Sequence, residues 1–217
     1  MNGGFVPGGA IDPVAEPLRW ASGTGRVAAL TFDDGPNGDD TARLLDFLAE
    51  TGIRAVFCVV GECILAPGGA ALLRRIVADG HLLGNHSTSF ADLGEATEDD
   101  AAAAMRQNLA IIRAALGDPG AAVPFFRAPN GSWGGTAAVA VGLGMQPLAV
   151  VNTIDDWRQT DTGVLVENLR AAIVPGELVL VHDGGGDRSP SIAAVRTVVG
   201  ERLAEGWSFT LPGIRTP

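Results

Sequence analysis

The feature that most constrains the fold of this chain is a repeated alternation of short apolar runs with longer helical stretches. The runs are rich in β-branched and aliphatic residues, as is typical of strands that are buried on both faces of a sheet. Repeated strand-then-helix units predict a parallel α/β sheet, either closed as a barrel or open and covered on both faces. We expect strands at Val27–Phe32, Ala55–Val60, His81–Asn85, Phe125–Phe126, Leu148–Val151 and Leu178–Val181.

The helical stretches carry recognisable start and stop signals. One helix is expected to begin after Thr97, whose side chain caps it, and to end at Gly117. Another has Ser189 as its cap, Pro190 at its first helical position and Gly206 at its end. Three more are marked by paired apolar residues ahead of a stop signal: Leu44 and Leu48 before Gly52, Leu72 and Ile76 before Gly80, and Leu165 and Leu169 before Pro175 and Gly176.

Length and composition favour one catalytic domain. A chain of 217 residues that is 47% hydrophobic buries one core and is short for two enzyme domains. Residues 1–25 are rich in Gly and Pro and lack a period, so we expect an irregular arm followed by a single domain over residues 26–217. No apolar segment precedes the first basic residue, Arg19, which favours a cytoplasmic protein with no export signal and no membrane partner.

The charged residues exclude several classes of function. The 15 basic residues against 25 acidic ones give a net charge of −10, which argues against a surface that binds nucleic acid. All the basic residues are Arg, so Schiff-base and P-loop lysines are excluded. Segment 130–134 has Asn130 where a serine-hydrolase elbow needs its first glycine. Cys58 and Cys63 lack the spacing of a disulfide framework or a structural zinc site.

Polar residues directly follow five of the expected strands. The carboxyl ends of parallel strands open on one face of the fold, where active sites are assembled. Taken singly, each segment also fits a structural role, such as a turn at Asp34 or a core histidine at His86. Their joint placement predicts one catalytic mouth. The segments are Asp33–Asp34, His86, Arg127, Asp155–Trp157 and His182–Asp183.

In their order and spacing these segments resemble the polysaccharide deacetylases, the NodB-homology group of family 4 carbohydrate esterases. The likeness covers roughly residues 26–211. It implies an α/β fold, a distorted (β/α) barrel of about seven parallel strands in a single domain. It also implies a hydrolase that removes an N-linked or O-linked acetyl group from a sugar. The matching segments are Thr31–Pro36, His86–Phe90, Arg127–Gly131, Asp156–Trp157 and Leu180–His182.

The resemblance assigns catalytic roles to four residues. Asp33 corresponds to the general base and Arg127 to the arginine that orients it. His182 corresponds to the general acid, with Asp156 tuning its protonation. Because Asp33 follows a strand, we expect it on the rim of the barrel without core contacts, so that Asp33→Asn leaves the fold intact.

Three further positions are implied to contact the substrate. Leu180 corresponds to part of a pocket for the acetyl methyl group, and Trp157 lies in the motif that carries Asp156. Asn130 stands where the family usually has Tyr or Phe, and the backbone N–H at this position helps to bind the oxyanion. This replacement changes the wall of the groove and keeps the backbone donor.

The second motif departs from the family pattern at Phe90, which stands where a second metal-binding histidine belongs. The resemblance implies a divalent ion, zinc or a similar metal, bound by Asp34 and His86. A catalytic zinc usually has three protein ligands and a water, and Phe has no lone pair. Three outcomes are open: Ser89 or Asp92 supplies an oxygen ligand, the two remaining ligands hold the ion with extra waters, or no metal binds.

Three functions remain open at this point. The first is a deacetylase that acts on a small soluble glycoside or another acylated metabolite. The second is a metal-independent isomerase, cyclase or lyase, because the proton-transfer residues are complete while the metal site is not. In that case Phe90 is part of an apolar substrate pocket. The third is a sugar-binding module without catalysis, which leaves the complete proton-transfer set unexplained.

Overall fold

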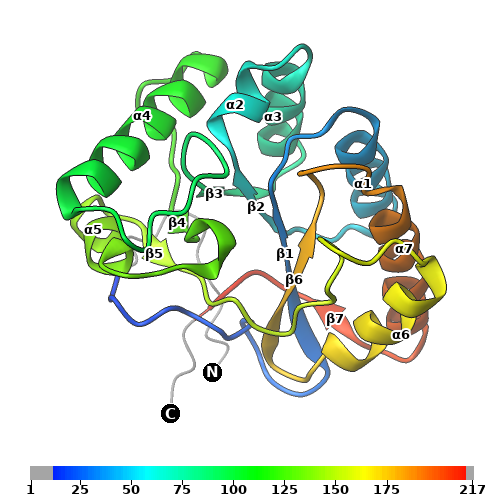
Figure 1. Ribbon diagram of the computed structural model, residues 1–217. Coiled ribbons are helices and arrows are strands. Elements are labelled where there is room, and N and C mark those ends of the chain that lie inside the picture. The colour runs from blue at the N-terminus through cyan, green and yellow to red at the C-terminus, as the bar shows by residue number, and fades with distance from the viewer. Residues whose placement is uncertain (1–11, 214–217) are drawn as a thin grey trace.

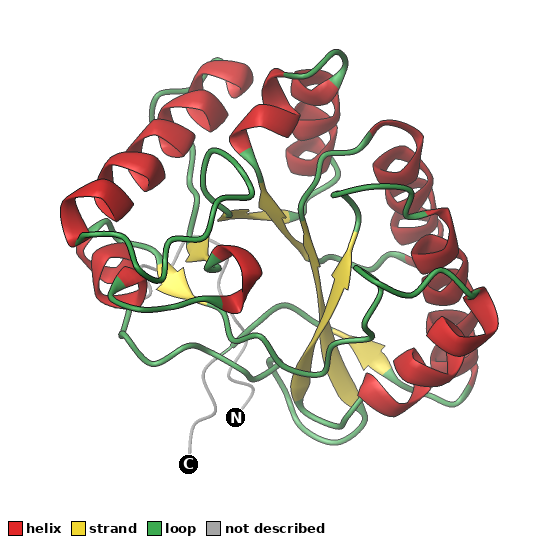
Figure 2. Ribbon diagram, in the orientation of Figure 1, coloured by secondary structure: helices red, strands yellow, loops and turns green. Residues whose placement is uncertain are grey.

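The computed structural model describes residues 12–213 and has a seven-stranded parallel sheet with helices around it (Figure 1). The order of the strands is β5-β4-β3-β2-β1-β6, and β7 pairs with the start of β1. Figure 2 shows the strands at the centre and the helices outside them. The predicted distorted (β/α) barrel is confirmed. The strands are β1 (Val27–Asp33), β2 (Val56–Val59), β3 (Leu82–Asn85), β4 (Phe125–Phe126), β5 (Gln146–Pro147), β6 (Glu177–His182) and β7 (Ser208–Phe209).

The expected helix signals act as predicted at most positions. The Thr97 hydroxyl accepts a hydrogen bond from the Asp100 N–H at 3.2 Å, and Gly117 ends that helix with a φ of 69°. Ser189 is not a cap, because the helix already includes it and Arg188 occupies the cap position. The helices are α1 (Gly38–Thr51), α2 (Gly61–Leu65), α3 (Gly69–Ala78), α4 (Glu98–Leu116), the 3-10 turn η1 (Pro129–Gly131), α5 (Thr136–Gly142), α6 (Thr162–Ala172) and α7 (Ser189–Ala204).

One strand prediction is wrong. The run Leu148–Val151 was expected to be a strand, but β5 ends at Pro147 and Leu148 forms only an isolated bridge with Leu18. The chain then leaves the sheet, and Val150 is exposed. An apolar residue in this run need not belong to a buried strand. Val150 instead lines the pocket described below, and periodicity cannot distinguish the two.

The described part of the arm, residues 12–25, has no helix or strand and completes the barrel. β5 and β6 are the two ends of the sheet path. Leu18 bridges to Leu148 after β5, and Trp20 bridges to Glu177 in β6. Backbone bonds from Leu18 N–H to Pro147 O (2.8 Å) and from Leu178 N–H to Arg19 O (2.9 Å) reinforce this link. The arm therefore spans the gap between the two open edges.

The alternation of side chains along β1 explains how the sheet leads to a polar site. Ala28, Leu30 and Phe32 pack into the larger core, under the helices. Val27 and Ala29 point to the opposite face and join a smaller core together with residues of the arm. Successive strand residues alternate between faces, so Thr31 and Asp33 share the face of that smaller core. None of the helices in the described range has the length and apolarity that a bilayer span needs.

Candidate active site

The deepest element of the site is a buried ion pair between Asp33 and Arg127. Arg127 Nη1 lies 2.6 Å from Asp33 Oδ1, and Arg127 Nη2 donates to Thr31 Oγ1 at 2.9 Å and to Ala149 O at 3.2 Å. Both charged side chains are almost completely inaccessible to solvent. The expectation that Asp33 lies on the rim without core contacts is therefore wrong, since the end of β1 carries it into the barrel interior.

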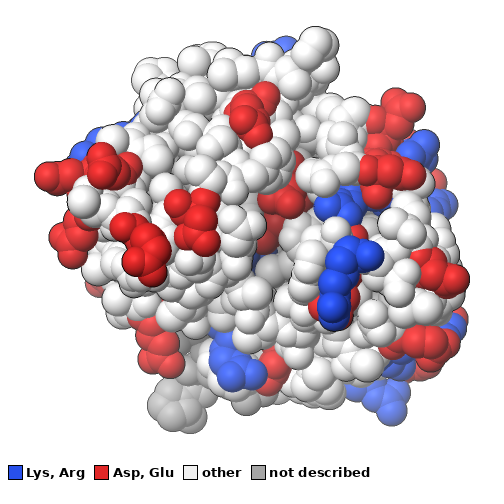
Figure 3. Space-filling model, viewed as in Figure 1, with Lys and Arg blue, Asp and Glu red and all other residues white. Residues whose placement is uncertain are grey.

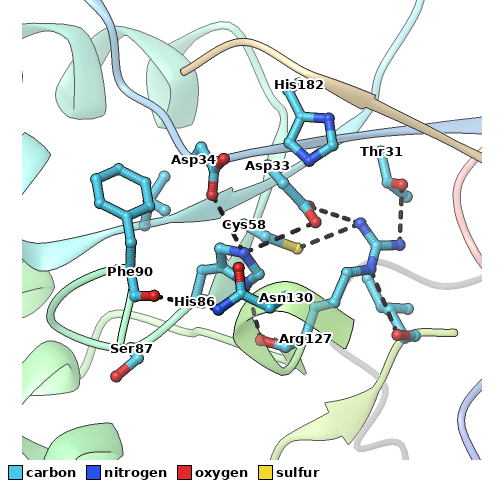
Figure 4. Close-up of polar contacts among 12 residues, drawn as sticks. Thr31, Asp33, Asp34, Cys58, His86, Ser87, Phe90, Arg127, Asn130 and His182 are labelled. Carbon is cyan, nitrogen blue, oxygen red and sulfur yellow. Dashed lines mark hydrogen bonds and ion pairs between the residues drawn. The ribbon is translucent and has the colours of Figure 1, made fainter. Parts of the chain in front are cut away.

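Asp34 and His86 face one another beside this pair (Figure 4). His86 Nε2 lies 3.3 Å from Asp34 Oδ1, while His86 Nδ1 donates to the Arg127 carbonyl at 2.8 Å. Burial lowers the pKa of His86, but the charges of Asp33 and Asp34 outweigh burial and raise it above its usual value. Burial raises the pKa of Asp34, but the hydrogen bond and charge of His86 bring it below its usual value.

Two residues in the loops of this region have a left-handed backbone conformation. Asp34 has a φ of 73° and Asn130 a φ of 56°, in the left-handed region that most residues avoid. Asn is one of the few non-glycine residues that adopt this conformation readily. This preference gives a physical reason for Asn at position 130, where the family usually has an aromatic residue. The Asn130 side-chain amide donates to the Phe90 carbonyl at 3.2 Å, which ties the two loops together.

His182 and Asp156 form the second proton-transfer element. His182 Nδ1 lies 2.7 Å from Asp156 Oδ1, and the His182 backbone N–H donates to Asp156 Oδ2 at 2.9 Å. Burial lowers the pKa of His182, but the hydrogen bond and charge of Asp156 raise it by more, so His182 holds its proton more firmly than a free histidine. The Trp157 ring packs edge-on against His182, with 5.7 Å between ring centroids.

These elements meet in one pocket with a cavity volume of about 370 Å³. Asp33 and His182 both line it, so the predicted base and acid face a common space. Asp156 lies behind His182 and is not part of the wall. Figure 3 shows acidic atoms in a hollow near the centre of this face of the molecule. The predicted residues that line the pocket are Asp33, Asp34, His86, Phe90, Asn130, Trp157, Leu180 and His182.

Two polar residues that follow strands do not reach the pocket. Asp155 forms an ion pair with Arg158 at the surface. Asp183 is fully buried on the other side of the Asp34 loop, where its Oδ2 accepts from Thr41 Oγ1 at 2.6 Å. The alternation along β6 predicts this, because neighbouring residues of a strand point to opposite faces.

The donor atoms only partly fit a catalytic zinc site. His86 Nδ1 donates to a carbonyl, which leaves Nε2 directed at Asp34 in the tautomer that metal-ligating histidines use. Within residues 12–213, however, no three His, Cys, Asp or Glu side chains converge as a metal site. Asp92 therefore does not supply the third ligand. The His, Cys, Asp and Glu side chains of the described residues do not supply three ligands for a zinc ion, and Ser89 is not among the residues that line the pocket.

Sequence reasoning missed several residues that shape the site. Val150 and Thr153 line the pocket from the segment that follows β5. Arg188 is buried, and its guanidinium donates to the carbonyls of Gly184 at 2.6 Å and Asp156 at 2.5 Å. Arg188 therefore links Asp156, which bonds to His182, to the glycine-rich turn. The period-2 pattern of β1 could have identified Thr31. No sequence signal distinguishes Arg188, because its partners are backbone atoms from distant segments.

Comparisons with known proteins agree with this geometry. The family model for polysaccharide deacetylase matches residues 21–148. The chain belongs to the polysaccharide deacetylase family. A chitooligosaccharide deacetylase from Sinorhizobium fredii is 37% identical to it over 169 residues, which cover 75% of each chain. A chitooligosaccharide deacetylase from Bradyrhizobium is 34% identical over 204 residues, which cover 89% of this chain and 86% of that one.

One solved structure supports the same family assignment, and a second shares the fold. An acetyl xylan esterase of family 4 from Clostridium thermocellum, in complex with a cobalt ion, is 28% identical, with a TM-score of 0.73 over 85% of this chain and 87% of that one. A peptidoglycan N-acetylglucosamine deacetylase shares the fold, with a TM-score of 0.80, 23% identity and 95% coverage of each chain. Polysaccharide deacetylases are hydrolases of amide or ester bonds. The enzyme class predicted from the motifs is therefore confirmed.

Proposed function

We propose that this protein removes the acetyl group from an N-acetylated amino sugar in a small glycoside. The observation that carries the proposal is the pairing of two proton-transfer groups across one pocket. Asp33 is held by Arg127, and His182 is held by Asp156. Leu180 lines the same pocket and would contact the acetyl methyl group. The names of the relatives, chitooligosaccharide deacetylases, support an N-acetylated sugar as the substrate class.

The side chains of this site support general acid–base hydrolysis. Asp33 accepts a proton from a water molecule as the water oxygen attacks the acetyl carbonyl carbon. His182 donates its proton to the amine nitrogen as the carbon–nitrogen bond breaks, so that acetate and a free amine form. The Asn130 backbone N–H is proposed to donate to the oxyanion that develops on the carbonyl oxygen. Arg127 keeps Asp33 oriented toward the attacking water.

None of these steps is assigned to a metal ion, because Asp34 and His86 supply only two protein ligands. A divalent ion bound there remains a prediction and is tested below. The deacetylase relatives favour hydrolysis over the isomerase, cyclase or lyase alternative, and the sugar-binding module is not favoured either.

The experiment is an acetate-release assay on N-acetylglucosamine glycosides, short chitooligosaccharides and O-acetylated xylosides. We expect wild-type protein to release acetate, and Asp33→Asn to lower kcat by about 10²–10⁴ because the general base is lost. Arg127→Ala should also lower kcat, since Asp33 loses its orientation. Wild-type rates in Asp33→Asn, measured in samples whose circular dichroism shows a folded chain, would contradict the proposal.

A further inference from the structure

The mouth of the pocket carries an unusual share of the exposed apolar side chains. Seven large hydrophobic residues are exposed in the part of the chain that the structure describes. Three of these line the pocket, and they come from two loops, the β3–α4 loop and the β5–α6 loop. They are Phe90, Val150 and Trp157, with 40%, 39% and 49% of their surface accessible. We call these three residues the apolar mouth. Exposed apolar groups gathered around a cavity are typical of a ligand-binding surface.

Neighbouring contacts hold the apolar mouth in place. The Asn130 amide donates to the Phe90 carbonyl, so the Phe90 loop is tied to η1. Trp157 packs edge-on against His182. Val150 lies against Gly131, where a Cβ atom would be only 3.4 Å from Val150 Cγ2. The apolar side chains are therefore presented toward the pocket by anchored segments (Figure 4 for Phe90).

The neutral polar side chains of the lining are few. Asp33, Asp34, His86 and His182 are engaged with one another or with their buried partners. Thr153, Asn130 and the indole N–H of Trp157 are the only neutral polar side-chain groups among the lining residues, all of which lie within residues 12–213. Each additional sugar ring brings several hydroxyl groups, and a hydroxyl that loses water without a new partner costs binding free energy.

Leu180 and the apolar mouth lie at different depths. Leu180 is almost fully buried, whereas the three residues of the apolar mouth are well exposed. The acetyl group therefore has its own contact deep in the pocket. Trp157 touches His182, the group that protonates the leaving amine in the proposed mechanism. This contact places Trp157, one of the three residues of the apolar mouth, on the leaving-group side of the scissile bond.

We infer that the apolar mouth binds an apolar substituent on the sugar, so that the substrate class is an amphipathic acetylated glycoside with an alkyl or aryl aglycone. This inference rests on the proposed deacetylase function and specifies its substrate. Burial of the aglycone between Phe90, Val150 and Trp157 supplies the binding free energy that a longer sugar chain would otherwise have to supply.

The test compares methyl, butyl and hexyl glycosides of N-acetylglucosamine with the chitooligosaccharides from dimer to tetramer. The apolar mouth can cover only part of the alkyl group of the glycoside. We therefore expect kcat/KM to rise roughly twofold per methylene, about 30-fold from methyl to hexyl. The rise from dimer to tetramer should be smaller. A rate that is flat along the alkyl series, or that rises more steeply with the number of sugars, would overturn the inference while leaving deacetylation established.

Substitutions locate the effect. Phe90→Ser and Val150→Ser should each reduce the hexyl-to-methyl ratio of kcat/KM by about threefold or more, because apolar contact area is lost. Val164→Ser is the matched control, since Val164 is similarly exposed at 41% but lies on α6, outside the pocket. An unchanged ratio in both pocket variants would show that the aglycone binds elsewhere.

Binding measurements separate this inference from the deacetylase proposal. Titration calorimetry with the methyl and hexyl glycosides should give a hexyl affinity at least about tenfold tighter, with a negative heat-capacity change. If no glycoside releases acetate, the proposed function fails, but the calorimetric ratio still decides whether the apolar mouth binds an aglycone. Equal affinities for the two glycosides would refute the inference.

Discussion

At the scale of single residues, Phe90 is the position on which the predicted metal site depends. Asp34 and His86 lie 3.3 Å apart, and Phe90, whose ring binds no metal, lines the same pocket. Asn130 holds the Phe90 backbone, so a side chain placed at this position starts from an anchored loop.

The first prediction is therefore a gain of metal affinity in Phe90→His. A third ligand adds a coordination bond and leaves one position for water, so the affinity for Zn²⁺ should rise by roughly tenfold or more. Isothermal titration with Zn²⁺ measures this, and Phe90→Leu is the control that removes the ring without adding a donor. Tight stoichiometric zinc in the wild type would show that another ligand already completes the shell.

Asp183 is a second residue whose environment sets a measurable property. Burial, together with the charges of Asp34 and Asp33, raises the pKa of this carboxyl to about 7, while the Thr41 hydrogen bond opposes the shift. Asp183 Oδ1 has no hydrogen-bond partner among residues 12–213, which suits a carboxyl group that stays protonated.

The second prediction follows from the sign of this shift. As pH rises from about 4 to about 7, the unfolded chain releases the proton while the folded chain keeps it, so stability falls. The free energy of unfolding should drop by up to about 4 kcal/mol over that range. Asp183→Asn should remove this drop in urea unfolding curves, whereas Asp39→Asn, on the surface of α1, should keep it. An unchanged pH dependence in Asp183→Asn would contradict the assignment.

At the scale of elements, the turn between β6 and α7 fits against the loop that carries Asp34. A Cβ atom on Gly184 would lie 2.0 Å from the Asp34 carbonyl oxygen, so only glycine allows this approach. Arg188 completes the turn by donating to the Gly184 and Gly185 carbonyls. The glycine-rich segment is thus a closely packed part of the site and not merely a flexible turn.

The third prediction concerns Gly184→Ala. The added methyl group must displace the Asp34 backbone and with it the neighbouring general base Asp33, and a shift of about 1 Å in a reacting group lowers rates by up to roughly 10². We expect a large loss of kcat with a smaller loss of stability. Gly200→Ala is the control, because it lies within α7 with open space around it and should stabilise the helix by about 0.5–1 kcal/mol. Wild-type kcat in Gly184→Ala would show that the close approach does not matter.

At the scale of the whole molecule, the N-terminal arm closes the barrel. Its bridges reach the two ends of the sheet path, and Leu18 is buried with Leu148 and Leu178 in the smaller core. The arm also bonds to the C-terminal segment, where Ser22 N–H donates to Leu211 O at 2.9 Å. The arm therefore connects segments that lie far apart in the chain.

The fourth prediction tests this closure. Leu18→Ala removes buried apolar surface and leaves a cavity between arm and sheet, so the free energy of unfolding should fall by about 2–3 kcal/mol. Val14→Ala, in the same arm but exposed, should change it by less than about 0.5 kcal/mol. Denaturant unfolding at fixed pH gives both values. Equal effects would mean that the arm does not contribute to the barrel.

The sequence by itself determined the parallel α/β architecture, the ends of most of the main helices and eight of the residues that line the pocket. These features depend on local physics: periodicity along a strand, capping at a helix end, and the common direction of parallel strands. Asp33, Asp34, His86 and His182 were predicted together for that reason. Phe90 was identified because it departs from the family pattern.

The tertiary structure alone decided which of these groups are buried and what they contact. Asp33 was expected on the rim, but it forms a buried ion pair with Arg127. Val150 was expected in a strand, but β5 ends at Pro147. The arm was expected to be separate from the domain, but Leu18 and Trp20 form bridges at the two ends of the sheet path. Each depends on contacts between segments far apart in the chain, because burial and pKa are set by neighbours in space and not by local pattern.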